Sequence, residues 1–237
     1  ALPFSTSIIL QDHIEWTQEL RLESGEGSEL EWVVGAFYAD SEIEGDATRW
    51  FVFEYPSPAP AGNFNDRTEQ TKYDLNSQNL GFFASISKDI SEKDTISAGL
   101  RFDNFEKNLS RNKRLQMPEY LPFAYPAQDT TTISDPQKET FSSLSPSVQW
   151  EHSFIEELKG NARITYAEKP GGFSAYSATP GKIAFSEEET MSYEMSILFN
   201  PSETWGLNLT AYLNDIESYQ FELPITDTTD YYVANAD

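Results

Sequence analysis

The stretch Met191–Asn214 reads MSYEMSILFNPSETWGLNLTAYLN and contains two runs in which every second residue is apolar. The odd-numbered residues are apolar or aromatic from Met191 to Phe199, and again from Trp205 to Leu213. Because successive side chains of a β-strand point to opposite faces, each run predicts a strand with one apolar and one polar face. The polar turn Pro201-Ser202-Glu203 joins the runs, so the stretch predicts a hairpin with one continuous apolar face.

The same pattern recurs in three earlier pairs of runs along the chain. They are Ile14–Ser24 with Leu30–Asp40, Tyr73–Ile90 with Thr95–Lys107, and Thr140–Phe154 with Asn161–Glu168. Short polar turns join the members of each pair. Long acidic or proline-rich segments separate the pairs, and we expect these to be loops or a loop hairpin: Ser41–Thr71, Asn108–Lys138 and Pro170–Glu187. Tyr231–Asn235 predicts the start of one more strand.

The alternation also predicts how the strands pair. It places Trp16 opposite Tyr38 in the first hairpin, because that register brings the large apolar groups to one face. In the third hairpin it places Trp150 opposite Ile164, which sets Glu151 opposite Arg163 on the polar face.

Long strands with short turns at one end and long connections at the other are typical of an antiparallel transmembrane β-barrel. Trp32, Trp150 and Trp205 lie on the predicted apolar face near short turns, where the aromatic girdle of a barrel meets the membrane surface. The rival interpretation is a soluble β-sandwich, in which one face also packs dry. Several runs exceed the roughly five or six residues usual for a sandwich strand, which favours the barrel.

Composition narrows the class of protein. The chain of 237 residues carries a net charge of −23, which argues against binding nucleic acid. A mean hydropathy of −0.53 is compatible with a barrel, because half of each strand and all the loops face water. The acidic clusters are either solvated surface or binding sites for divalent cations or a cationic ligand. No run matches the calcium-loop spacing or a catalytic motif, there is no Cys, and His13 and His152 are far apart. We therefore expect no enzyme activity, no cofactor and no metal site.

Several segments resemble TonB-dependent outer-membrane receptors. The similar segments are Gln18–Ser24 (QELRLES), Glu31–Tyr38 (EWVVGAFY), Ser97–Phe102 (SAGLRF), Leu144–Val148 (LSPSV), Tyr166–Phe173 (YAEKPGGF), Glu188–Glu194 (EETMSYE) and Tyr232–Asp237 (YVANAD). Each is weak alone, but their order and spacing cover nearly the whole chain. The family's usual Gly-Tyr before Lys-Pro-Gly-Gly-Phe is replaced here by Glu168.

The resemblance implies an outer-membrane importer of Gram-negative bacteria with a barrel of about 22 strands. It implies a scarce nutrient, foremost an iron-siderophore or similar metal chelate, and uptake energised by the TonB complex. It also implies contact with outer-membrane lipid and lipopolysaccharide. The family's plug domain and TonB-contacting box have no counterpart here, so we expect residues 1–237 to be a partial, mid-barrel segment. The alternative is an extracellular β-sandwich that binds carbohydrate through loop aromatics.

Candidate ligand contacts must lie on the polar face or on the long connections. Arg101 and Arg163 have the planar guanidinium suited to carboxylates and phosphates, although pairing across strands or with a plug is an alternative role for them. The aromatic candidates are expected in loops, where packing of the loop is the alternative role: Trp50, Phe123, Tyr125, Phe173 and Tyr176.

Overall fold

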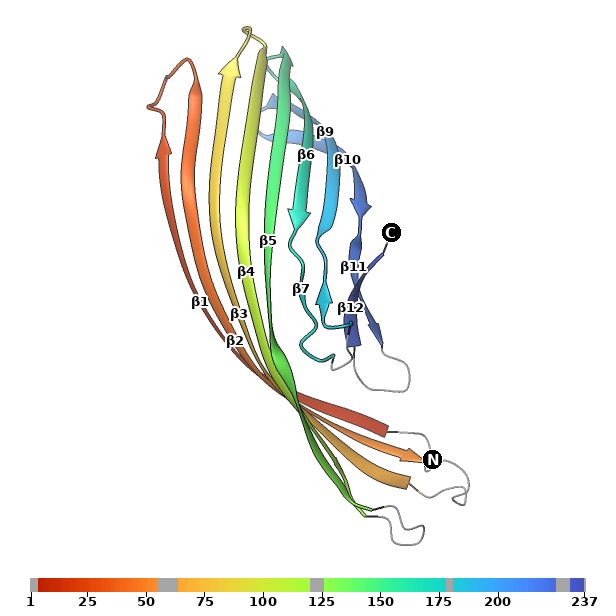
Figure 1. The fold of residues 1–237 in the computed structure, drawn as a ribbon. Coiled ribbons are helices and arrows are strands. Elements are labelled where there is room, and N and C mark those ends of the chain that lie inside the picture. Colours follow the sequence, from red (N-terminus) through yellow and green to blue (C-terminus); the bar gives the residue numbers. More distant parts are fainter. Residues whose placement is uncertain (1–3, 55–63, 120–125, 178–180, 225–230, 237) are drawn as a thin grey trace.

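The computed structural model describes residues 4–54, 64–119, 126–177, 181–224 and 231–236, and these form β-strands and their connections. Eight strands make one antiparallel sheet in the order β1-β2-β3-β4-β5-β6-β9-β10 (Figure 1). Their bounds are β1 Phe4–Glu23, β2 Glu31–Glu54, β3 Phe64–Asp89, β4 Asp94–Met117, β5 Gln128–Ile155, β6 Leu158–Lys169, β9 Glu188–Ser202 and β10 Trp205–Glu217. No helix in the described part of the chain has the length and apolar character needed to cross a bilayer.

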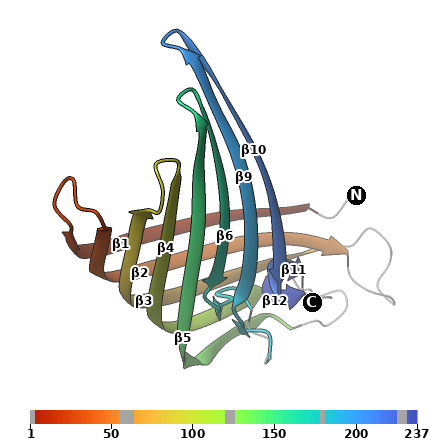
Figure 2. The ribbon, with the colours of Figure 1, turned by 90° about the horizontal axis from the view of Figure 1, so that it is seen from above.

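The sheet is a single curved layer that wraps part of the way around an open interior (Figure 2). Two small sheets lie within its curve, one of β7 (Gly172–Phe173) with β8 (Ala184–Phe185), the other of β11 (Tyr219–Pro224) with β12 (Tyr231–Ala236). The predicted strand at Tyr231 is therefore present, but it pairs with β11 and not with the large sheet.

The convex face of the large sheet carries the apolar residues, as the alternation predicts. We call the outward apolar side chains between the short turns and the middle of the strands the apolar band; most are more than two-fifths exposed, Ile14 reaching 71%. Its large members are Ile14, Trp16, Leu20, Leu22, Trp32, Val34, Leu80, Phe82, Ile86, Ile96, Leu100, Phe102, Leu144, Val148, Trp150, Ile164, Tyr193, Met195, Ile197, Trp205, Leu207, Leu209 and Leu213. Among the described residues, no second sheet covers this convex face, whereas a β-sandwich would require one there.

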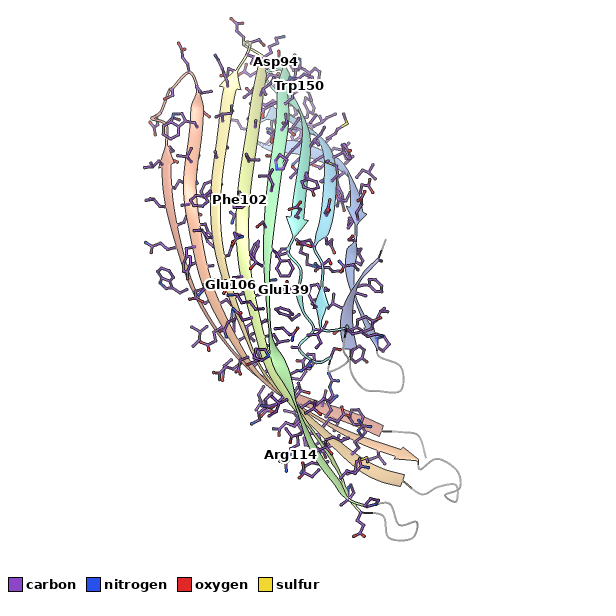
Figure 3. All side chains as sticks on the ribbon, in the orientation of Figure 1. Asp94, Phe102, Glu106, Arg114, Glu139 and Trp150 are labelled. Atoms are coloured by element: carbon purple, nitrogen blue, oxygen red, sulfur yellow. The ribbon has the colours of Figure 1, made fainter. Side chains whose placement is uncertain are left out.

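Polar side chains replace the apolar ones on the same face beyond the band. They are Asp40, Gln78, Asn104, Glu168, Glu189 and Asp215. At the other end, Asp94 and Trp150 lie beside the short turns, and Phe102 lies farther along β4, between Asp94 and Glu106 (Figure 3). The outward surface is thus an apolar belt between two polar rims, which is the pattern of a surface that meets hydrocarbon.

Two of the three long connections are shorter than the sequence predicts, because the flanking strands continue into them. β2 pairs with β3 as far as Glu54 and Phe64, and β4 pairs with β5 as far as Met117 and Gln128. Cross-strand polar contacts replace apolar alternation in these extensions: Arg114 binds Asp129 through two hydrogen bonds of 2.8 and 2.7 Å, and Lys72 lies 3.4 Å from Asp46. A search for alternating apolar residues therefore misses them.

Two predicted registers are wrong by two residues. Gln18, not Trp16, lies opposite Tyr38. In the third hairpin Trp150 lies opposite Ala162, so Arg163 faces Gln149 and not Glu151. An even shift keeps every side chain on its predicted face, so alternation alone cannot detect it. Glu151 instead makes an ion pair of 3.4 Å with Lys159.

Strands β1–β5 bend sharply toward the interior beyond their middle (Figure 1). Between Leu109 and Arg111 the β4–β5 ladder shifts register, because β5 inserts an extra residue around Pro136. A bulge of this kind bends a strand and tightens its twist, and it is one of the few sheet positions that accept proline. Arg114 lies beyond this bend (Figure 3).

The buried core lies on the concave side of the bend. It consists of Tyr73, Leu109 and Phe173, with Ile43, Leu75, Ala175, Tyr176 and Ile183 packed around them. It joins the large sheet to the segment after β6, so this is where that segment is fixed.

Candidate functional site

The candidate site is the concave face at the bend together with the segments that cover it. We call those covering segments the shelf: residues 170–177 and 181–187 with strands β11 and β12. Odd-numbered side chains of β2–β4, and of β5 from Gln137 to its end at Ile155, point toward the shelf, because even-numbered ones form the apolar band. The extra residue near Pro136 reverses this numbering in the first part of β5.

Two cations of β4 hold the shelf by its backbone carbonyls. Lys107 Nζ donates to the carbonyl of Gly171 at 2.8 Å. Arg111 Nη1 donates to the carbonyls of Ser174 and Ala175 at 3.5 and 3.3 Å. Gly171 allows this close approach, because an added Cβ would overlap the Phe141 ring and the carbonyl oxygen of Phe185.

Asn235 fixes the opposite side of the shelf. Its Nδ2 group donates to the carbonyls of Ser186, Glu187 and Ser218 at 3.1, 3.1 and 2.8 Å, and its Oδ1 accepts from the Ser186 N–H at 2.8 Å. Ser218 has a positive φ of 52°, which marks the break between β10 and β11. Asn235 therefore ties β12, the end of the shelf loop and this break together.

Aromatic rings and a guanidinium connect the shelf to β2. Arg49 lies over the rings of Tyr176 and Tyr231, 5.0 and 5.9 Å from their centroids. Tyr176 in turn meets Tyr73 edge to face at 5.6 Å. Burial, with the hydrogen bond and charge of Tyr176, raises the pKa of Tyr73 to about 12, so this phenol stays protonated at neutral pH.

The concave wall is cationic although the chain as a whole is acidic. The odd-numbered cations at and beyond the bend, on the face that the shelf covers, are Arg49, Arg67, Lys107, Arg111 and Lys113. Glu69, only 2% exposed, makes ion pairs with Arg67 and with Lys113, the latter at 3.1 Å. A buried carboxylate needs such partners because it has lost its water.

The structure places the site residues predicted from the sequence in several separate regions. Phe173 is 8% exposed within the core, and Tyr176 is half-buried beside it, so the structure brings these two together. Trp50 lies in β2 rather than in a loop, and its even number puts it on the face opposite the shelf. Phe123 and Tyr125 lie outside the described residues.

The two predicted arginines lie nearer the short turns. Arg101 binds Asp103 through hydrogen bonds of 2.6 and 2.7 Å and lies 5.5 Å from the centroid of the Phe37 ring. Arg163 donates to Thr165 at 3.1 Å and stands opposite Glu194 in the ladder. Their roles in ligand contact remain predictions.

The sequence did not single out Arg49, Tyr73, Lys107, Arg111 or Asn235. Two features of the sequence could have pointed to these residues. The cations of β4 are odd-numbered, so they lie on the polar face, and two family-like segments contain Gly171 and Asn235. Among the described residues there is no group of three or more His, Cys, Asp or Glu side chains placed to hold a metal ion.

Comparison with models of known protein families finds one that matches nearly the whole chain. The family model described as TonB dependent receptor-like, beta-barrel, matches residues 4–237. Comparison with curated protein sequences finds no significant match.

A solved structure of low sequence identity shows the same fold. The ferric yersiniabactin uptake receptor from Yersinia pestis matches 91% of this chain with a TM-score of 0.68 and 14% identity, and the match covers 30% of that receptor. The ferric-catecholate import receptor from E. coli K12 matches 94% of this chain at 8% identity with a TM-score of 0.47, over 43% of its own length. The chain thus spans less than half of either receptor. Its eight-stranded sheet and the match over residues 4–237 show that it belongs to the TonB-dependent receptor family and forms part of the family's β-barrel.

Proposed function

We propose that this chain is part of the wall of an outer-membrane transporter that imports a scarce nutrient with energy from the TonB complex. The observation that carries the proposal is the apolar band on a single-layer sheet, since a face of this kind needs lipid or another apolar surface to cover it. The family supports the same reading, because its members are outer-membrane β-barrels of Gram-negative bacteria that transport rather than catalyse.

The nutrient we propose first is an iron-siderophore. The support is the yersiniabactin receptor, whose name records uptake of a ferric chelate and whose fold the chain shares. The cationic concave wall also suits an anionic chelate better than a cationic one. Ligand would contact the shelf and the bend, with Tyr176 and the other aromatic and arginine residues predicted from the sequence as candidate contacts.

The partners that we propose are outer-membrane lipid, lipopolysaccharide and the TonB complex. The apolar band would face outer-membrane lipid, and the polar rim beyond it, which includes Gln78 and Asn104, would meet lipopolysaccharide. Contact with TonB would be made by the plug and box that the resemblance to the family implies. We propose no catalytic role and no resident cofactor.

Uptake of radioactive iron tests the proposal. Cells that express the full-length receptor as their only iron receptor should accumulate iron from one class of ferric siderophore, and deletion of TonB should abolish the uptake. Uptake that is the same with and without the receptor, for hydroxamate, catecholate and carboxylate chelates alike, would contradict an iron-siderophore substrate.

A further inference from the structure

Strands β5 and β6 separate partway along their length. Their ladder begins at the short turn and ends where Ser147 lies opposite Thr165. Beyond that point β5 continues to Gln128 with no strand on that side among the described residues, while β6 stays paired with β9 as far as Lys169. Beyond the bend β5 is therefore a free edge of the sheet, although β6 follows it in the strand order (Figure 1).

A proline explains why the ladder ends there. In a regular strand, every second residue directs its N–H and C=O groups toward the same neighbouring strand. Leu144 directs its N–H toward β6, where it meets the side-chain carboxylate of Glu168 at 3.1 Å instead of a backbone carbonyl. Pro146, two residues farther on, faces the same way but has no N–H to donate. The sequence thus ends the β5–β6 ladder at this proline.

The facing of the side chains indicates which backbone groups lie on the free edge. Leu144 lies on the outward face and directs its N–H to the free side. Because a strand of L-residues couples the face of a side chain to the direction of its backbone groups, the other outward residues of β5 do the same. Beyond the bulge these are Asp129, Thr131 and Ile133, which lie opposite even-numbered residues of β4.

The run Gln128–Ile133 lacks the devices that protect an edge strand. Natural proteins blunt a free edge with lysine, proline or a bulge. In β5 the bulge, Pro136 and Lys138 all lie nearer the bend, and the run itself (QDTTTI) contains no Lys, Arg or Pro. All six of its residues are exposed, Ile133 by 78%, and its three threonines and isoleucine are β-branched. Such residues favour the pairing of strands.

The missing part of a barrel wall would not cover this edge. The strands at the two ends of the large sheet are β1 and β10, so further wall strands would pair there. A strand opposite the six residues of the run would span about 20 Å and would need backbone groups at every second residue. A polypeptide offers that pattern, whereas a lipid or a small chelate does not.

We propose that the free edge of Gln128–Ile133 docks an extended segment of a protein outside the cell, which adds to β5 as one more strand. The edge belongs to the end with the long connections, which faces outside the cell in outer-membrane barrels. Backbone groups of Asp129, Thr131 and Ile133 would hold the segment, and the exposed Ile133 side chain favours an apolar residue beside it. This inference goes beyond the proposed transport, and peptide binding can be measured whether or not the receptor imports iron.

Fluorescence polarisation with the purified full-length receptor in detergent tests the docking edge. The probe is a labelled peptide RNKRLQM, the sequence of residues 111–117, because this segment already pairs with the other side of the same run. We expect saturable binding of this peptide. The same peptide with every backbone nitrogen methylated keeps its side chains but can donate no backbone hydrogen bond, so it should bind at least tenfold more weakly.

Two pairs of variants separate strand addition from attraction of a cationic peptide. Thr131→Pro removes one N–H of the free edge, a position where proline is tolerated, and should weaken binding at least tenfold, whereas Thr131→Val should stay within twofold of the wild type. Ile133→Lys places a charge on the edge and should also weaken binding at least tenfold. Leu10→Lys adds the same charge to an outward residue, 66% exposed, on β1 at the far side of the sheet, and should change the affinity less than twofold.

Hydrogen exchange shows whether the edge is free in the receptor itself. The amides of Thr131 and Ile133 should exchange fast in the receptor alone and at least tenfold more slowly with the peptide, while unchanged exchange of β4 in Thr131→Pro shows that the hairpin stays folded. Slow exchange of both amides without peptide would overturn the proposal, because another segment of the receptor would then occupy the edge. Absence of saturable binding, or equal affinity for the methylated peptide or in Thr131→Pro, would overturn it as well.

Discussion

At the scale of single residues, a few polar groups and glycines position the shelf, and none belongs to a catalytic motif. Asn235 makes four hydrogen bonds to backbone groups from two distant segments. Gly171 lets the chain pass close to Phe141. Such contacts cannot be read from the sequence, because the partners Lys107 and Gly171 lie 64 residues apart. The family-like segments contain Gly171 and Asn235 but not Lys107, and only the structure shows what these residues do.

Replacing Gly171 by alanine should loosen the shelf. The new methyl group would overlap the Phe141 ring and the Phe185 carbonyl, and overpacking of this kind costs about 1–3 kcal/mol. Hydrogen exchange should therefore become faster in residues 170–177. Gly25→Ala is the matched control, since nothing lies within 4 Å of the place that its new methyl group would take. Unchanged exchange in Gly171→Ala would show that the shelf is not packed as described.

The pKa of Asp94 predicts how the stability of the short-turn end of the sheet depends on pH. Asp94 lies at that end, before the apolar band begins. Hydrogen bonds from Ser91, His152 and Trp150, at 2.6, 2.7 and 3.0 Å, lower the pKa of Asp94 to about 2. An unfolded Asp has a pKa of about 3.9. The contribution of these bonds to stability is therefore present above about pH 4 and is lost as the pH falls through about 2.

Carbon NMR of the Asp94 carboxyl in the full-length receptor, assigned by comparison with Asp94→Asn, should give a midpoint near a pH of about 2. Ser91→Ala should raise the midpoint, because it removes the largest cause of the shift. A wild-type midpoint near the unfolded value of about 3.9 would contradict the hydrogen-bonded geometry.

At the scale of elements, the faces of the strands could be predicted from the sequence, but the registers and strand ends could not. Alternation with a period of two assigns Leu207 and Asn208 to opposite faces wherever the strand lies. The same alternation is blind to a shift of two residues, which is the error in the first and third hairpins. The strand extensions were missed because both of their faces carry polar residues, so that ion pairs such as Arg114–Asp129 take the place of an apolar pattern.

A charge on the apolar face should be far more harmful than one on the concave face of the same strand. Leu209→Arg places a guanidinium in the middle of the apolar band and should cost about 2–4 kcal/mol. Thr210→Arg, the next residue, points to the interior and should be tolerated. The fraction of full-length receptor that folds into lipid vesicles, read from heat-modifiable gel mobility, measures the difference. Equal folding of the two variants would contradict the assignment of the faces.

Cysteine cross-linking tests the observed register of the first hairpin. Gln18→Cys with Tyr38→Cys places two thiols directly opposite each other, at a spacing a disulfide can bridge. Trp16→Cys with Tyr38→Cys places them diagonally, at roughly 7–8 Å, which is too far. Oxidation should therefore cross-link the first pair efficiently and the second poorly. The reverse result would restore the register predicted from the apolar pattern.

At the scale of the whole molecule, the two faces of the curved sheet have opposite character. The convex face is apolar between polar rims, and the concave face at the bend carries cations beneath the shelf. The strongly acidic composition hides this division, because the net charge of −23 averages over both faces. The cations at the bend can be assigned to the concave face only when the pairing of the strands is known.

The apolar band should contact hydrocarbon, and the opposite face should line a wet interior; every other proposal for this protein depends on that division. Electron paramagnetic resonance of nitroxides at Leu209→Cys and Thr210→Cys tests it most directly, in the full-length receptor reconstituted into vesicles. We predict that the label at 209 collides mainly with oxygen dissolved in lipid, and the label at 210 mainly with a water-soluble nickel chelate. A label at 209 that is shielded from both reagents, or that reacts with the nickel chelate as readily as the label at 210, would contradict it.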